Sequence, residues 1–175
     1  PAGLVKKGHF HQLGMAGGAP VLLVAEGYAT AATLYEATGL PVAVAFDAGN
    51  LAPVATALHK RHKTAHILIC ADDDTFSEGN PGVTCASAAA MEVGGAYVAP
   101  TFADTAARQA AFDTKGAKLT DFNDLHAAEG LHVVRAQVEA RLLALGWRLQ
   151  GHARASTPTG EGGCATGPVA MAPIE

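Results

Sequence analysis

The sequence predicts an α/β fold: a mostly parallel sheet of four short strands with helices on both faces, followed by a C-terminal helix. Three observations support this prediction. Short apolar runs recur along the chain, the stretches between them have helical character, and acidic residues follow two of the runs where the strands would end. The four expected strands cover residues 21–25, 42–46, 67–71 and 96–99.

Two helices are expected between the first three strands. The first covers residues 28–38, is rich in alanine and ends at Gly39 and Pro41. The second covers residues 51–62, with Asn50 as its expected N-cap. Because helical crossovers between parallel strands are right-handed in nearly all proteins, the carboxyl ends of these strands share one edge of the sheet.

Three further segments complete the predicted fold. A helix over residues 83–93 follows a loop rich in glycine, asparagine and proline. Residues 101–120 are polar and irregular, with one or two helical turns expected near residues 106–112. The last helix, over residues 131–145, carries its apolar residues on one stripe and is expected to pack on the sheet.

Composition narrows the classes of function. The 175 residues are 49% hydrophobic and 16% charged, which is typical of a globular domain with its own core. A net charge of -4 argues against a basic module that binds nucleic acid through charge alone, although an enzyme could act on nucleic acid held by another domain. The cysteines Cys70, Cys85 and Cys164 form no Cys-x-x-Cys, which indicates free thiols in a reducing cytoplasm. No apolar run is long enough to cross a membrane, so we expect a cytoplasmic protein.

The chain is expected to hold one domain between two appendages. Residues 1–20 are interpreted as an N-terminal extension, the tail of a preceding domain with a short edge strand. Residues 21–149 form the domain. Residues 151–175 are rich in small residues and proline and are expected to be a flexible linker. Because the sequence begins at Pro1 without methionine, we interpret it as a piece of a longer protein.

Acidic residues follow two of the predicted strands. Asp72 and Asp74 come directly after the third run, and alternation along an extended chain points them to one side and Asp73 to the other. Two carboxylates that share a side repel each other, and a hard cation such as Mg²⁺ removes that repulsion. Glu26 follows the first run, so it is expected at the same edge of the sheet. A solvated acidic turn is the alternative for Asp72 and Asp74.

Other polar residues have two interpretations each. Asp121 and Asp124 fit the capping of a helix and also fit additional metal ligands. The candidates for binding phosphate or nucleic acid are basic: Lys60, Arg61, Lys115 and Lys118. For Lys60 and Arg61, cations that stabilise the C-terminal end of a helix are the favoured interpretation.

Three phrases of the sequence resemble the Toprim domain of TraC-like primases. They are VAEGYATA at residues 24–31, VAFDAGNL at residues 44–51 and TDFNDL at residues 120–125. Toprim domains occur in bacterial-type primases, topoisomerases, some nucleases and recombination mediators. The resemblance implies a Rossmann-like Toprim fold and a primase from a plasmid, phage or integrated element, often fused to a zinc-binding module or a helicase.

The resemblance also implies roles for the acidic residues. Asp72 and Asp74 would ligate Mg²⁺ or Mn²⁺, and Glu26 would serve nucleotidyl transfer as a ligand or general base. The implied substrates are nucleoside triphosphates and a single-stranded DNA template on which short primers are made. Lys118 is then a candidate contact for the incoming nucleotide. The segment after Asp74 is longer than the common Asp-x-Asp-x-x-Gly form, which leaves the role of its loop residues open.

Two alternatives share this fold. A Toprim-type nuclease would use the same acids for metal-dependent strand cleavage. A non-catalytic Toprim module would bind DNA or protein partners as a scaffold. Three converging carboxylates favour an enzyme over the scaffold.

Overall fold

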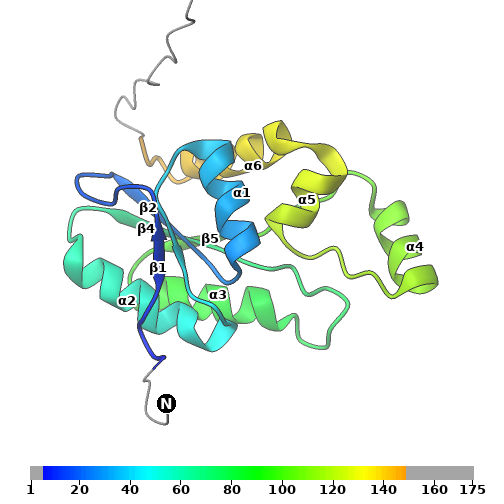
Figure 1. Ribbon diagram of the computed structural model, residues 1–175, viewed down its shortest axis with the longest axis horizontal. Helices are drawn as coiled ribbons and strands as arrows, with labels where there is room; N and C mark the ends of the chain where they lie inside the picture. The colour runs from blue at the N-terminus through cyan, green and yellow to red at the C-terminus, as the bar shows by residue number, and fades with distance from the viewer. Residues whose placement is uncertain (1–5, 149–175) are drawn as a thin grey trace, which may run out of the picture.

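A computed structural model of the protein describes residues 6–148, and the predicted linker at residues 151–175 lies outside them (Figure 1). The described residues contain one five-stranded sheet with the strand order β1-β3-β2-β4-β5. The strands are β1 (His11–Leu13), β2 (Val21–Ala25), β3 (Val42–Val44), β4 (His66–Cys70) and β5 (Ala96–Val98). The helices are α1 (Tyr28–Thr38), α2 (Leu51–Arg61), α3 (Pro81–Glu92), α4 (Thr105–Lys115), α5 (Phe122–Glu129) and α6 (Leu131–Ala144), with a short 3₁₀ helix at Ala48–Asn50.

The sheet confirms the predicted α/β class and adds one strand to it. Strands β2, β3, β4 and β5 are parallel, as the sequence predicts. The additional strand β1 pairs antiparallel with β3, so that His11 lies opposite Val44. A short edge strand was expected in this N-terminal segment, and it closes one side of the sheet.

Helices cover both faces of the sheet (Figure 1). Alternate residues of β2 enter two separate cores, with Leu23 on one side and Leu22 on the other. The first core packs against α1, α5 and α6, and the second packs against α2 and α3. All five residues of β2 are buried, which explains why the strand is apolar without alternation.

The structure corrects several local expectations. The strand expected over residues 42–46 ends at Val44, and Phe46 takes a left-handed conformation with φ 67°. Asn50 precedes α2 but its side chain makes no capping bond. Its amide instead donates to the backbone oxygens of His9 and Ala45, at 2.9 and 2.8 Å, and so ties the N-terminal segment to the end of β3.

Helix α4 is the largest difference in a helical segment. It has 11 residues where one or two turns were expected. Asp104 caps its first turn by accepting a hydrogen bond from the Ala107 N–H, and Gly116 ends it in a left-handed conformation. A cap and a terminal glycine therefore define this helix better than its weak apolar pattern does.

Two further findings concern the cysteines and the lengths of the helices. Cys70 and Cys85 are free thiols, while Cys164 lies outside the described residues. Across residues 6–148, none of the helices has the length and apolar character needed to span a bilayer.

Candidate active site

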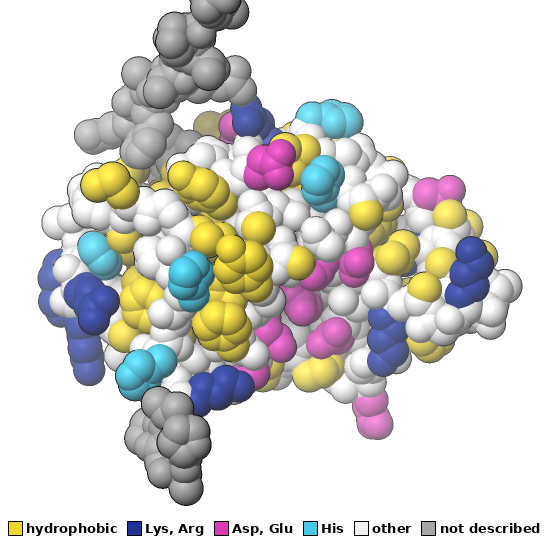
Figure 2. All heavy atoms as spheres, viewed as in Figure 1, with side chains coloured by type: hydrophobic (Ala, Val, Ile, Leu, Met, Phe, Trp, Pro, Cys, Tyr) yellow, Lys and Arg dark blue, Asp and Glu magenta, His cyan; other side chains and the backbone are white. Residues whose placement is uncertain are grey.

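The acidic residues gather where β2 and β4 end. These neighbouring strands are in register, with Ala25 opposite Cys70. Glu26 follows β2 immediately, and Asp72 follows β4 after a single alanine. The two carboxylates therefore leave adjacent strands at the same edge. Figure 2 shows acidic side chains gathered in the middle of one face, with basic side chains on both sides of them.

Helix α5 brings two more carboxylates to this edge. The Thr30 hydroxyl of α1 donates to Asp121 Oδ2, and the Thr33 hydroxyl donates to Asn123 Oδ1 at 3.0 Å. These buried threonines dock the start of α5 on α1. Their role is not predictable from the sequence, because two threonines within an alanine-rich helix carry no signal of a distant partner.

Asp121 and Asp124 also cap α5, as one interpretation predicts. Asp121 Oδ1 accepts the Asp124 N–H at 2.7 Å, while Asp124 Oδ2 accepts the Asp121 N–H at 3.3 Å and the Thr120 N–H at 2.8 Å. Together they form a capping box. Both oxygens of Asp121 thus have protein donors, which makes this residue poorly suited to bind a cation directly.

Asp72 is the most strongly perturbed carboxyl group at this edge. Its Oδ1 is buried and has no hydrogen-bond partner among the described residues. Burial, and then the negative charges of Glu26 and Asp121, raise the pKa of Asp72 to about 7. Asp74 and Asp124 add to this repulsion. A buried carboxylate oxygen without a partner is costly in free energy, and within residues 6–148 no donor offsets that cost for Asp72 Oδ1.

Glu26 has a related environment. Partial burial is the main cause that raises its pKa, and the charges of Asp74 and Asp47 add to it. Asp47 follows β3, and it pairs with Lys6 of the N-terminal segment. Neither Asp47 nor Lys6 was singled out as a site residue from the sequence, because only the sheet order places them beside Glu26.

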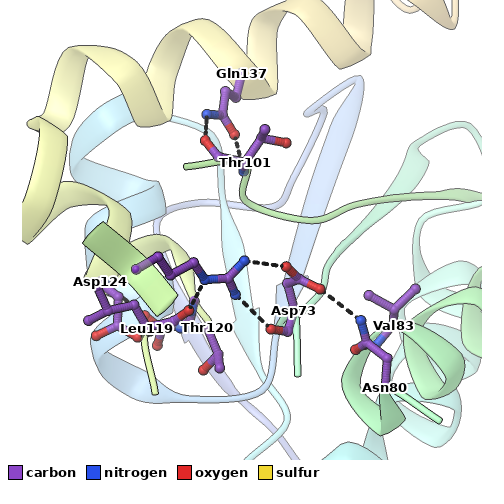
Figure 3. A network of polar contacts seen from close by, with 10 residues as sticks. Asp73, Asn80, Val83, Thr101, Leu119, Thr120, Asp124 and Gln137 are labelled. Carbon is purple, nitrogen blue, oxygen red and sulfur yellow. Dashed lines mark hydrogen bonds and ion pairs between the residues drawn. The ribbon is translucent and has the colours of Figure 1, made fainter. Parts of the chain in front are cut away.

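Asp73 turns away from this group, as alternation predicts. Its Oδ2 accepts a hydrogen bond from Arg108 Nη1 at 2.8 Å, and its Oδ1 accepts one from Asn80 Nδ2 at 2.7 Å (Figure 3). Arg108 also donates to the backbone oxygens of Asp73 and Leu119, at 3.0 and 2.8 Å. Asp73 therefore anchors the acidic loop between α4 and the start of α3.

Gly82 allows α3 to begin close to the acidic loop. A Cβ at this position would lie 2.3 Å from the backbone oxygen of Asp72, which no side chain can tolerate. The Gly82 N–H donates to Asp74 Oδ2 at 3.0 Å. The helix also begins two residues earlier than expected, at Pro81. Its positive N-terminal end thus faces the Asp74 carboxylate.

The acidic residues at this edge fit a metal site in which a bound ligand completes the coordination of the ion. No group of three His, Cys, Asp or Glu side chains within residues 6–148 is arranged to hold an ion by itself. Mg²⁺, however, is commonly bound by one or two carboxylates together with substrate phosphates. The orphaned Oδ1 of Asp72 and the raised pKa of this one carboxyl group are consistent with such a partial site.

The basic candidates divide between two regions. Lys118 lies beside the acidic loop, where its Nζ donates to Ser77 Oγ at 3.3 Å. Lys115 is exposed in the last turn of α4. Lys60 and Arg61 end α2, which leads back to the start of β4 at the opposite edge of the sheet. They have the positions expected of cations at a helix C-terminus, and the structure does not bring them to the acids.

Comparisons with known proteins agree with this architecture. Residues 21–132 match the Toprim domain family. Two curated relatives, both described as DNA primase TraC from Escherichia coli, are 46% and 45% identical over 105 residues. That region is 56% of this chain, but only 10% and 7% of the relatives, so the chain spans a small part of their length. No solved structure matches the chain.

Proposed function

The chain belongs to the Toprim domain family, and from this premise we propose that it is the catalytic core of a DNA primase. Its reaction is metal-dependent nucleotidyl transfer, which makes short primers on single-stranded DNA during plasmid or phage replication. The similarity to DNA primase TraC supports a primase-type role. The much greater length of those relatives is consistent with zinc-binding or helicase domains outside this stretch.

The observation that carries the proposal is the unpartnered Asp72 carboxylate. It lies in a group of acids at the carboxyl edge of a parallel sheet, where α/β proteins bind ligands. A structural role would pair this oxygen with a donor, as Arg108 and Asn80 do for Asp73. An oxygen left without a donor among acids suits a divalent cation.

Each residue has a distinct task in this proposal. Asp72 and Asp74 hold the cation, and Glu26 acts as a further ligand or as the general base. The raised pKa of Glu26 makes its carboxylate a stronger base, which suits a group that takes a proton from an attacking hydroxyl. Mg²⁺ or Mn²⁺, when bound, would orient the triphosphate and stabilise charge on the attacking and leaving oxygens. Lys118 contacts the triphosphate, and exposed Lys115 at the end of α4 is a second candidate for this contact.

A Mn²⁺ titration followed by paramagnetic broadening tests the metal site. We expect Asp72→Asn to weaken binding by about tenfold or more, because it removes the central charge. Glu26→Gln should weaken it less if Glu26 acts mainly as a base. Asp113→Asn is the matched control, since Asp113 lies exposed on α4 and bonds only to Gln109 in the described structure.

Two outcomes would count against the proposal. Equal Mn²⁺ binding by the wild type and Asp72→Asn would favour a non-catalytic Toprim module.

If Asp72→Asn loses the metal, the same substitution in the full-length protein should abolish primer synthesis on single-stranded DNA. Strand breaks without incorporation of nucleotides would instead indicate a nuclease.

A further inference from the structure

Two large aromatic side chains are exposed beside the acidic edge. Tyr28 is 54% exposed and Phe46 is 53% exposed. Tyr28 comes two residues after Glu26 and begins α1, while Phe46 comes two residues after β3. The His11 ring lies against Tyr28, with 5.8 Å between the ring centroids and 40° between their planes. Figure 2 shows hydrophobic side chains directly beside the acidic group on this face.

Phe46 is exposed on a backbone conformation that costs conformational free energy. Its φ of 67° is unfavourable for a residue with a side chain, and Asn80 is the other non-glycine residue with positive φ within residues 6–148. The Phe46 N–H donates to the Glu26 backbone oxygen at 2.8 Å, which fixes the turn against β2. A strained residue that exposes its ring instead of burying it is typical of a binding surface.

Positive charge borders these rings. Asp47, the residue after Phe46, pairs with Lys6. Lys6 and Lys7 line an open pocket of about 390 Å³ together with Asp47, Gly49 and Asn50. Both lysines are exposed. The surface next to the acids therefore offers flat rings followed by Lys7 and by Lys6, whose charge Asp47 partly offsets. The rings complement the bases of a nucleic-acid strand, and the ammonium groups complement its phosphates.

We propose that Tyr28 and Phe46 form a stacking platform for single-stranded nucleic acid, with its phosphates along Lys6 and Lys7. This inference rests on the proposed function, because nucleotidyl transfer needs a strand held within reach of Glu26. Stacking explains how a chain of net charge -4 binds a polyanion, since aromatic rings hold bases without relying on charge. Stacking is also tolerant of base sequence, as a template surface requires.

Tryptophan fluorescence tests the platform. The only tryptophan, Trp147, stacks on His66 with 4.4 Å between centroids, and His66 begins β4 at the opposite edge. We expect oligothymidylate to quench the fluorescence of Phe46→Trp and to leave that of the wild type unchanged. The titration is performed in EDTA, so that the result does not depend on metal binding.

Affinity measurements with labelled oligothymidylate supply the matched controls. Tyr28→Ala and Phe46→Ala should each weaken binding about tenfold, as expected for the loss of one base-stacking contact. Tyr28→Phe keeps the ring and should bind as the wild type does. Tyr35→Ala removes an exposed ring from the far part of α1 and should have no effect. Circular dichroism confirms that each variant is folded.

Three results would overturn the platform. These are unchanged affinity in both alanine variants, absence of oligonucleotide binding by the wild type, and equal quenching by thymidine mononucleotide at the same concentration. The last result would assign the rings to a free nucleotide instead of a strand. Asp72→Asn should not weaken strand binding in EDTA, so a failure of the platform is distinguishable from a failure of the proposed metal site.

Discussion

The charge on Asp72 is unfavourable in the metal-free protein. Its pKa is about 7 in the folded protein against an ordinary 3.8, so the folded state holds a proton that the unfolded chain releases. With respect to this group, the folded protein is therefore most stable below pH 4, and this stability is lost as pH rises through about 7. The dominant cause is burial, which favours the neutral acid.

Asp72→Asn should therefore stabilise the metal-free protein in a pH-dependent way. A shift of this size corresponds to about 4 kcal/mol, and allowing for solvent screening of a half-buried group we expect a gain of ~2 kcal/mol at pH 8. At pH 4 the two proteins should be equally stable, because Asp72 is then protonated. Urea unfolding in EDTA at both pH values measures this difference. An equal gain at pH 4 and pH 8 would show that the charge is not its source.

Asp72 and its neighbours show which features of single residues can be predicted from the sequence. Alternation along a strand suffices to separate Asp72 and Asp74 from Asp73, because it is a local rule. The requirement for glycine at position 82 is not local, since it arises from the 2.3 Å that would separate a Cβ from the Asp72 oxygen. The role of Arg108 is likewise not predictable from the sequence, because a polar segment carries no local signal of its partner Asp73, 35 residues earlier.

At the scale of elements, α4 is joined to the acidic loop mainly through Arg108. This side chain is buried, and its guanidinium lies over the rings of Phe102 and Phe76, at 4.6 and 5.2 Å from their centroids. It pairs with Asp73 and also bonds to two backbone oxygens. A single residue thus holds three separate segments in place.

A double-mutant cycle should reveal strong coupling between Arg108 and Asp73. We expect Arg108→Ala to destabilise the protein by about 3 kcal/mol, because it leaves the Asp73 carboxylate without its cation, with a coupling energy of about 2 kcal/mol. Arg108→Lys should recover little, since an ammonium cannot reproduce the guanidinium bonds. Gln109→Ala, on the exposed side of α4, is the control. Additive effects measured by urea unfolding would contradict this role.

Elements with a strong local pattern were predicted well. The buried strands and α1, α2 and α6 have long apolar or alanine-rich runs, and the structure places them within a few residues of expectation. The N-terminal edge strand was harder to predict, because β1 is three residues long and β3 is its one strand partner within residues 6–148. Asn50 is a similar case: a good capping residue that instead bridges distant backbone groups.

At the scale of the whole molecule, the sheet separates two basic regions. Lys118 lies at the carboxyl edge beside the acidic loop, whereas Lys60 and Arg61 lie at the amino edge. The strand β4 has 5 residues, which at ~3.3 Å per residue places the two edges ~16 Å apart. This separation exceeds the Debye length of ~8 Å at physiological salt, so charges at one edge are largely screened from the other.

Charge reversal at the two edges should consequently have unequal effects on nucleotide binding. We expect Lys118→Glu to weaken the binding of a nucleoside triphosphate with Mg²⁺ by about tenfold, because a close cation is replaced by an anion beside the phosphates. Lys60→Glu combined with Arg61→Glu changes the net charge by twice as much but should alter affinity less than twofold at physiological salt. Isothermal titration at two salt concentrations measures both.

The comparison separates a local contact from a general field. If the molecule attracted nucleotides through its overall charge, the double variant at the end of α2 would have the larger effect, and its effect would fade as salt increases. If Lys118 contacts the triphosphate directly, its variant dominates at both salt concentrations, because a contact at the site is screened far less. Equal losses in the two proteins would instead extend the binding surface across both edges of the sheet, and would restore Lys60 and Arg61 as nucleotide contacts.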